Sequence, residues 1–339
     1  MSSMISSDRQ VAERRAPWQD ILARLISDPD ELLDRLGLQI ADLPIPEQVL
    51  RDFPLRVPES LLDRIRPGDP ADPILLQVLP GIREGDDTPG YSVDPLSEAE
   101  FNPRPGLLHK YHGRALMLTA PHCAIHCRYC FRRHFPYDDN TPGRLQWQQS
   151  LDYLRQNTDV DEVIFSGGDP LAAGDRQLAW LSREIAAIPH VRRLRIHTRT
   201  PVVVPQRVCT EMLDWLSASP LQKVMVIHSN HPNEINDEVA AAMAAIRGAG
   251  VTLLNQSVLL AGVNDDADVL AELSEKLFSA NVLPYYVHML DRVQGVAHFD
   301  VDEDRAEHIM SQLRNRLPGY LVPRLVREIP GEGSKTPLF

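Results

Sequence analysis

Residues 121 to 135 carry the densest set of reactive side chains in the sequence. Three of the four cysteines lie there, as Cys123, Cys127 and Cys130, in the spacing C-x3-C-x2-C. Three thiolates on one short loop are typical of a ligand set for a metal or a cluster. A [4Fe–4S] cluster bound only by thiolates needs a fourth cysteine, but Cys209 stands far along the chain in a predicted helix. The spacing therefore indicates a cluster with one iron open to a substrate or cofactor.

Two other uses of these cysteines have to be weighed. A structural zinc knuckle would use the same thiolates with His126 or His134 as the fourth ligand. A disulfide framework fits poorly, because a chain of 339 residues with four cysteines and no basic, apolar export signal is typical of a reducing compartment. We therefore expect a cytoplasmic protein.

Composition limits the classes of partner. The net charge of −12 argues against a nucleic-acid backbone as the main partner. The sequence has no run of the roughly 18 apolar residues that a membrane span needs. A hydrophobic fraction of 43% is enough for a sizeable soluble core. Formation of a homo-oligomer stays open.

The elements that must position the cysteines follow from periodicity. The apolar spacing predicts helices at 17–37, 57–66 and 72–79. The many Pro and Gly residues at 80–106 predict a connector. From residue 115 onward, short apolar runs alternate with amphipathic stretches. The predicted strands are 115–119, 162–165, 194–198, 223–228, 252–258 and 284–289. The predicted helices are 145–157, 176–188, 206–218, 235–249, 266–280 and 303–316.

Six successive β/α units predict a parallel sheet, either a partial (β/α)6 barrel or a doubly wound open sheet. In a barrel the chemistry lies at the C-terminal ends of the strands. Polar or glycine-rich residues do follow each predicted strand, which favours the barrel. We expect an N-terminal helical region with its connector at 1–100, a barrel at 101–317 and a short C-terminal segment at 318–339.

The residues after the strands have both functional and structural interpretations. Gly167, Gly168 and Asp169 would let a ligand approach the backbone and accept from its hydroxyl or ammonium group, or would form a tight turn with a capping acid. His228 and His231 are candidate metal ligands, and with His197 they would form a candidate zinc site. A histidine at the end of a strand more often forms hydrogen bonds, and we favour that role. Residues near the cysteines add positive charge, which would pair with a carboxylate or only balance the thiolates; they are Arg128, Arg132 and Arg133.

Lys335 lies four residues from the end of the sequence, after Gly331 and Gly333. A lysine that forms a Schiff base needs a site of low dielectric that depresses its pKa. A frayed tail with a solvated lysine is the alternative, and the physical arguments from sequence alone favour it.

Several long strings resemble the lysine 2,3-aminomutase family of radical S-adenosylmethionine (SAM) enzymes. They are Cys-Arg-Tyr-Cys-Phe-Arg-Arg-His-Phe, Arg-Thr-Pro-Val-Val-Val-Pro-Gln-Arg, Asn-His-Pro-Asn-Glu-Ile, Leu-Leu-Asn-Gln-Ser-Val-Leu-Leu-Ala-Gly-Val-Asn-Asp, Leu-Pro-Tyr-Tyr-Val-His and Gly-Ser-Lys-Thr-Pro. Within that family, Asp-Pro-Asp-Glu-Leu-Leu, Phe-Pro-Leu-Arg-Val-Pro-Glu-Ser and the short C-terminus are most similar to the branch that acts for elongation factor P (EF-P).

The resemblance implies a role for each matching residue. Cys123, Cys127 and Cys130 would bind the [4Fe–4S] cluster. The SAM site would be lined by Gly167, Gly168, Asp169, His228 and Gln256. Lys335 would hold pyridoxal 5′-phosphate (PLP) covalently, and the PLP phosphate would be bound by Lys110, Tyr111 and Arg114. Arg132 would bind the substrate carboxylate and Asp291 its side-chain ammonium.

Two departures bear on function. Glu328 stands where the free-lysine enzymes have a second Asp before the PLP lysine, and the cysteine-bearing C-terminal tail of those enzymes has no counterpart here. The resemblance thus implies a radical conversion of (S)-α-lysine to (R)-β-lysine, which a partner ligase attaches to EF-P, with a reducing electron donor. A catabolic free-lysine 2,3-aminomutase and a non-catalytic zinc or iron–sulfur scaffold protein are the alternatives.

Overall fold

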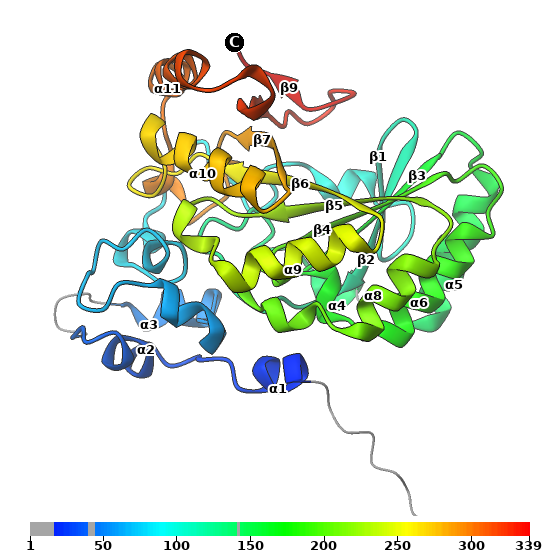
Figure 1. The fold of residues 1–339 in the computed structure, drawn as a ribbon, viewed down its shortest axis with the longest axis horizontal. Helices are drawn as coiled ribbons and strands as arrows, with labels where there is room; N and C mark the ends of the chain where they lie inside the picture. The colour runs from blue at the N-terminus through cyan, green and yellow to red at the C-terminus, as the bar shows by residue number, and fades with distance from the viewer. Residues whose placement is uncertain (1–16, 40–44, 141–142) are drawn as a thin grey trace, which may run out of the picture.

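The computed structural model describes residues 17–39, 45–140 and 143–339 (Figure 1). Residues 1–16 of the predicted N-terminal region lie outside this part of the chain, as do 40–44 and 141–142. Within it, the strands form one nine-stranded sheet in the order β1 to β9. Strands β2 to β8 are parallel, and β1 and β9 pair antiparallel at the two ends.

The strand order follows the sequence without reversal, and this excludes the doubly wound alternative, whose order reverses at a switch point. The strands are β1 Leu107–Tyr111, β2 Arg114–Ala120, β3 Glu162–Gly167, β4 Arg193–Thr198, β5 Gln222–His228, β6 Val251–Val258, β7 Leu283–His288, β8 Arg324–Arg327 and β9 Thr336–Pro337. The six predicted strands correspond to β2 to β7. The six β/α units of a partial barrel are thereby confirmed.

Helices connect the parallel strands on the outer face of the sheet, where α6 packs beside α8 and α10 beside α11 (Figure 1). They are α4 Tyr137–Asn140, α5 Arg144–Gln156, α6 Asp175–Ala186, α7 Thr200–Val203, α8 Thr210–Ala218, α9 Asp237–Gly248, α10 Ala267–Ser279 and α11 Glu303–Arg316. The prediction of a helix over 206–218 was wrong at its start. Pro205 opens a separate 3-10 turn, and Cys209 is the extended N-cap residue of α8.

The two faces of the sheet differ in packing. Residues that face the helices, such as Leu194 and Ile196 on β4, are at most 1% exposed. Alternate residues on the same strands face the interior of the barrel and are only half-buried, as His197 on β4 and Gln256 on β6 are. Because a filled core would bury both faces equally, this pattern indicates an interior that side chains do not fill.

The N-terminal region is less regular than predicted. Residues 17–37 form α1 Pro17–Ala23 and α2 Pro29–Arg35, and the Asp28 side chain caps α2 as expected. The predicted helices at 57–66 and 72–79 are short 3-10 turns, Glu59–Arg64 and Leu75–Gln77, and α3 Glu47–Asp52 was not predicted. Their apolar side chains pack with Ala124, Ile125, Val203 and Val204. This region therefore covers the cysteine loop and the segment after β4.

Candidate active site

The cysteine loop begins where β2 ends, at the C-terminal edge of the parallel strands. Backbone hydrogen bonds tie it to the N-terminal region: the N–H of His126 donates to Arg56 O at 3.0 Å, and that of Arg128 to Gln77 O at 2.8 Å. Within the loop, the N–H of Cys130 donates to Cys127 O at 3.0 Å. The loop is thus fixed by local turns and by the N-terminal residues Arg56 and Gln77, which lie well before it in the sequence.

Glu84 in the predicted connector clamps two arginines of the loop. The buried guanidinium of Arg128 donates to Glu84 Oε1 at 2.8 Å and Oε2 at 2.5 Å, and Arg133 donates to Oε2 at 2.7 Å. Bidentate pairs of this kind fix orientation as well as charge. One carboxylate therefore offsets part of the positive charge of the two arginines, and the connector contributes directly to the structure of the cysteine loop.

The three thiols suit a cationic centre. Burial raises the pKa of Cys123 well above its ordinary value, with Asp169 and the other two cysteines adding to the effect. Burial and the Cys127 thiol raise the pKa of Cys130 to about 11. Three neighbouring thiolates therefore repel one another unless positive charge compensates them, and a ligated iron–sulfur cluster would supply that charge. The donor set fits the predicted cluster.

Arg199 was not anticipated from the sequence. Its Nη1 donates to the sulfur of Cys127 at 2.8 Å and lies 2.6 Å from the Tyr129 hydroxyl, while its Nη2 donates to Glu234 Oε2 at 2.8 Å. Its guanidinium thus links a cysteine that follows β2 to elements that follow β4 and β5. The only sequence signal was its place directly after a strand, a place it shares with many structural residues.

Gly167 and Gly168 are required by close backbone approach. A Cβ atom at Gly167 would lie 2.3 Å from Ala120 O, and one at Gly168 would lie 2.5 Å from His122 O. Gly167 also has a φ of 135°, in the region that favours glycine. Both glycines therefore let the end of β3 touch the backbone that leads into Cys123. This packing accounts for them whether or not a ligand also approaches.

We expect Gly168→Ala to lower stability by about 1–3 kcal/mol, because the added methyl group meets backbone atoms that cannot rotate away. Iron incorporation should fall with it, since the displaced backbone carries Cys123. Gly248→Ala is the matched control, because a Cβ there meets no atom within 4 Å. Thermal unfolding and iron content of the two variants check this. Equal unfolding temperatures would refute the packing argument.

Asp169 uses its carboxylate within the protein. Oδ1 accepts from Leu171 N at 3.0 Å and Thr198 Oγ1 at 2.7 Å, and Oδ2 accepts from Arg199 N at 2.7 Å and Thr200 N at 3.0 Å. A carboxylate has about four acceptor positions, and all are taken here. Asp169 thus joins the ends of β3 and β4. Its bond from Leu171 N matches the structural interpretation, a tight turn with a capping acid.

The histidines at the strand ends take separate roles. Nε2 of His228 lies 2.9 Å from the Gln256 amide nitrogen on the paired strand, so the imidazole accepts. Burial, with Arg199 nearby, lowers the pKa of His228 to about 3. His231 instead caps a 3-10 turn by accepting from Asn233 N at 3.1 Å. In the part of the chain described, no three His, Cys, Asp or Glu side chains converge to hold one metal ion.

Two further histidines, on β4 and β7, bring polar atoms to the barrel interior. The Nε2 atoms of His197 and His288 are buried and have no hydrogen-bond partner among the described residues. Burial lowers the pKa of both imidazoles well below the ordinary value. Neutral ring nitrogens without a partner are groups that a polar ligand in the interior would satisfy. With His228 and Gln256 they fit a polar cofactor such as SAM.

Glu328 gathers the predicted PLP residues. Lys335 Nζ donates to Glu328 Oε2 at 2.8 Å, and Lys110 Nζ and the Tyr111 hydroxyl donate to Oε1 at 3.0 and 2.8 Å. The Arg114 guanidinium lies 4.6 Å from the centre of the Tyr111 ring. Burial alone would raise the pKa of Glu328, but Lys335 and Lys110 outweigh it and hold the pKa well below its usual range.

The contacts of Lys335 bear on whether the C-terminal segment is ordered or frayed. Strand β8 adds a parallel strand beside β7, and β9, which begins directly after Lys335, folds back antiparallel on β8. Lys335 is therefore held in the sheet rather than frayed. Cationic groups around a fixed amine fit the phosphate and the aldehyde of PLP.

The carboxylate expected on Arg132 is supplied by the protein. Nε and Nη2 of the buried Arg132 donate to the two oxygens of Glu98 at 2.8 and 2.7 Å, and Nη1 donates to Ser166 Oγ at 3.0 Å. Burial alone would lower the pKa of Arg132, but Glu98 outweighs it and raises the pKa. Arg132 is thus arranged to bind a carboxylate in the bidentate manner.

Asp291 is the carboxylate that remains available. No hydrogen bond to its side-chain oxygens is found among the described residues. Burial and the nearby charge of Glu328 raise the pKa of Asp291 to about 7. The same pKa responds to Lys335, Glu98 and Lys110, while that of His197 responds to Lys335 and Arg132. Lys110 and Lys335 both donate to Glu328, and Arg132 donates to Glu98, so these charges come together from distant parts of the sequence.

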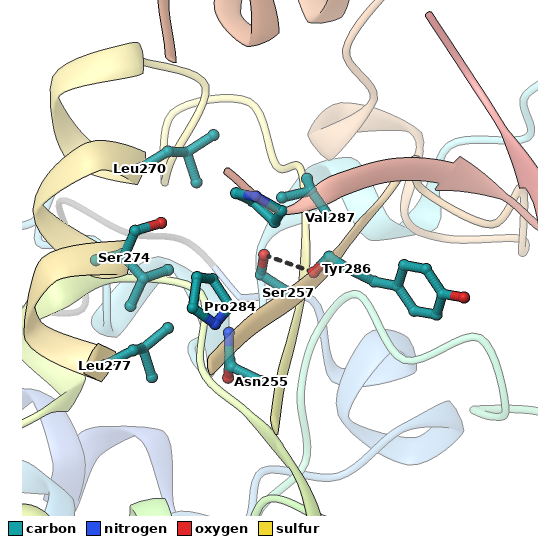
Figure 2. Close-up of a pocket in the computed structure, with 10 residues that line it drawn as sticks. Asn255, Ser257, Leu270, Ser274, Leu277, Pro284, Tyr286 and Val287 are labelled. Carbon is teal, nitrogen blue, oxygen red and sulfur yellow. Dashed lines mark hydrogen bonds between the residues drawn. The ribbon is translucent and has the colours of Figure 1, made fainter. Parts of the chain in front are cut away.

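A small gap on the outer side of the sheet is unrelated to this site. It lies between Leu270, Ser274 and Leu277 of α10 and strands β6 and β7 (Figure 2). Its volume is about 10 Å³, barely room for one water. The Tyr286 ring points away from it (Figure 2). We regard it as a packing defect.

Comparisons with known proteins agree with this geometry. The sequence profile of the Radical SAM superfamily matches residues 117–273. The chain is 51% identical to the L-lysine 2,3-aminomutase of Escherichia coli, over 96% of this chain and 95% of that protein. It is 50% identical to that of Haemophilus influenzae, over 94% of each, and 38% identical to that of Clostridium subterminale, over 95% of this chain and 77% of that protein.

Among solved structures, a radical SAM methyltransferase from Sphaerobacter thermophilus has a TM-score of 0.47 and 17% identity, over 65% of this chain and 68% of that one. That likeness is too remote to bear on function. No helix in the described residues has the length and apolar character needed to cross a membrane. The identities of 51% and 50% over nearly the whole chain, together with the profile match, are decisive. The chain belongs to the lysine 2,3-aminomutase family of radical SAM enzymes, which are isomerases.

Proposed function

We propose that this protein converts free (S)-α-lysine to (R)-β-lysine, with a [4Fe–4S] cluster, SAM and PLP as cofactors, for the modification of EF-P. The observation that carries the proposal is the placement of three groups at the C-terminal ends of the parallel strands: Arg132 after β2, Asp291 after β7, and Lys335, which donates at 2.8 Å to Glu328 directly after β8. An amine, a carboxylate-binding fork and a free carboxylate are the groups that the recognition of lysine through PLP requires.

Each cofactor has residues suited to it. Cys123, Cys127 and Cys130 would hold the cluster. His228, Gln256 and the backbone at Gly167 and Gly168 would line the SAM site, with Asp169 positioning that backbone. Lys335 would hold PLP, with Lys110, Tyr111 and Arg114 near its phosphate. When bound, the cluster and SAM would supply the radical that removes a β-hydrogen, and PLP would activate the migrating amino group.

The protein's own residues place the substrate. Arg132 would fix the α-carboxylate, and Asp291 would fix the side-chain ammonium at the opposite end of the molecule. Glu328, already bonded to Lys335, Lys110 and Tyr111, would hold the amine of Lys335 in place and balance its charge. A lysine residue inside a polypeptide has neither a free α-carboxylate nor a free α-amine. This recognition therefore favours free lysine as the substrate.

The test is anaerobic reconstitution with iron, sulfide, PLP and SAM, followed by an assay with lysine and a reductant. β-Lysine should form, and SAM should be regenerated rather than consumed. EF-P incubated with its ligase and the product should then gain the mass of one lysyl residue. Lysine returned unchanged by a fully loaded protein would contradict the proposal, and β-lysine that EF-P does not accept would leave the catabolic function.

A pH dependence follows from Asp291. The ammonium group would bind to the ionised carboxylate of Asp291, whose pKa is about 7. The KM for lysine should therefore rise as pH falls, by about tenfold between pH 8 and pH 6. The charges facing this carboxylate are Glu328, Lys335, Glu98 and Lys110. Initial rates at fixed SAM across this range check the prediction.

Asp291→Asn should raise the KM at pH 8 by roughly 10- to 150-fold, the equivalent of about 1.5–3 kcal/mol for a hydrogen bond to a charged group. The pH dependence of KM should flatten in this variant. Asp304→Asn, on the exposed face of α11, is the matched control and should change neither. An unchanged KM at pH 8 in Asp291→Asn would place the ammonium elsewhere, with Glu328 as the next candidate.

A further inference from the structure

We infer that Glu98 is a built-in competitor for the substrate carboxylate, which must displace it from Arg132. The inference rests on the proposed function, in which Arg132 binds the α-carboxylate of lysine. In the structure, Nε and Nη2 of Arg132 donate to the two carboxylate oxygens of Glu98 at 2.8 and 2.7 Å. This is the bidentate geometry that a bound amino-acid carboxylate would adopt.

The other contacts of Arg132 leave no second fork. Nη1 donates to Ser166 Oγ at 3.0 Å and lies 3.3 Å from Gly167 O. Of the five N–H groups of the guanidinium, one on Nη2 remains. A substrate carboxylate can therefore gain two parallel hydrogen bonds only if Glu98 gives them up. Glu98 is also close enough to the interior to raise the pKa of Asp291.

The surroundings of Glu98 allow it to leave. Glu98 opens a 3-10 turn, Glu98–Phe101, none of whose residues is buried. The residue before it, Ser97, has a φ of 51°, in the left-handed region that is costly for a non-glycine residue. A cavity of about 520 Å³ adjoins the pair and is lined by both Glu98 and Arg132, and by Asn102, Arg104 and Phe135 among others.

A rotation of the Glu98 side chain into this cavity would break its two hydrogen bonds to Arg132. The backbone of the turn is held separately, because the N–H groups of Glu98 and Ala99 donate to Asp94 at 3.0 and 3.3 Å. Arg104 also lines this cavity and contributes positive charge to its wall. Before substrate arrives, Glu98 keeps the buried charge of Arg132 paired, and an unpaired buried charge would be costly. A ligand without a carboxylate cannot complete the exchange.

The decisive variants are Glu98→Gln, Arg132→Gln and the double variant, with Glu100→Gln as the matched control on the same turn. Lysine affinity is measured as KM and, without turnover, by calorimetry on the oxidised holoenzyme. Glu98→Gln should tighten lysine binding by about three- to tenfold, since the competitor loses its charge and one hydrogen bond. Acetate should inhibit this variant more strongly than the wild type. Arg132→Gln should weaken lysine binding, and adding Glu98→Gln to it should change nothing further.

The possible failures can be told apart. If Glu98→Gln weakens lysine binding as Arg132→Gln does, Glu98 orients Arg132 for the substrate and the competitor inference is overturned, while the proposed function stands. An unchanged affinity in Glu98→Gln has the same consequence for the inference. If Arg132→Gln leaves lysine binding unchanged, the carboxylate site of the proposed function fails, and the inference fails with it.

Discussion

Lys335→Ala should abolish the rearrangement of lysine, with a loss of more than about a thousandfold, the scale seen when a residue that bonds covalently in catalysis is removed. The structure holds the Lys335 amine at 2.8 Å from Glu328, which Lys110 and Tyr111 also contact. No other described amine except that of Lys110 contacts Glu328. The cysteine loop is distant in sequence and separately braced, so iron content should stay normal. Iron analysis, the PLP absorbance and a β-lysine assay check this result.

The location of PLP can be settled by chemical labelling. Borohydride reduction should fix PLP on Lys335, and a peptide map should find it there. The sequence has four lysines, and two of them, Lys110 and Lys335, share the carboxylate of Glu328. Lys276→Ala, at a surface ion pair on α10, is the matched control and should keep both label and activity. Label on Lys110 would reverse the assignment of the two lysines.

Loss of any one of the three loop cysteines should remove the iron–sulfur cluster and every reaction of SAM. Cys123→Ala, Cys127→Ala and Cys130→Ala each leave two thiolates, too few to retain a cluster that already lacks a fourth protein ligand. The brown absorbance, the iron and sulfide content and the reductive cleavage of SAM should all disappear together. Retention of a full cluster by any of these variants would show that its ligands are misassigned.

Cys209→Ala is the matched control for these variants. Cys209 lies at the N-cap of α8, where its sulfur is 3.6 Å from Asp175 Oδ2 and 3.7 Å from Arg207 Nη1. It therefore belongs to a separate cluster of polar residues on the outer side of the barrel. The variant should keep the cluster and SAM cleavage, and its loss of iron would make Cys209 a ligand.

Secondary structure inside the barrel was predictable because the period of a strand, two residues, and that of a helix, 3.6 residues, both show within a short stretch of sequence. Strand β4 alternates buried Leu194 and Ile196 with half-buried neighbours, so the sequence pattern and the fold carry the same information. Asp266 and Asp302, before α10 and α11, cap those helices in the structure. The start of α8 was harder, because Pro205 and the extended Cys209 separate two turns that share one apolar pattern. Short 3-10 turns near the N-terminus lack a pattern long enough to distinguish them from helices.

Partner choice within the site was not predictable in the same way. Glu84 and Glu98 lie in a Pro- and Gly-rich stretch where acids are normally solvated, and nothing local marks them as partners of Arg128 and Arg132. Glu328 meets Lys110 across 218 positions of sequence. Such contacts depend on how the two ends of the sheet approach each other. Hydrogen-bond chemistry alone does not determine which carboxylate pairs with a given lysine or arginine.

The sequence by itself determined the chemistry available to this protein: three thiolates on one loop, the order of six β/α units and a lysine that follows two glycines in the C-terminal segment. These depend on residue type and short spacing, which covalent connection preserves. Only the tertiary structure decided that Lys335 is held by β8 and β9 rather than frayed, and that Arg132 already holds a carboxylate. It also left the Asp291 carboxylate without a hydrogen-bond partner among the residues that the structure describes. Burial and pairing are properties of surfaces brought together by folding, so no local pattern could have fixed them.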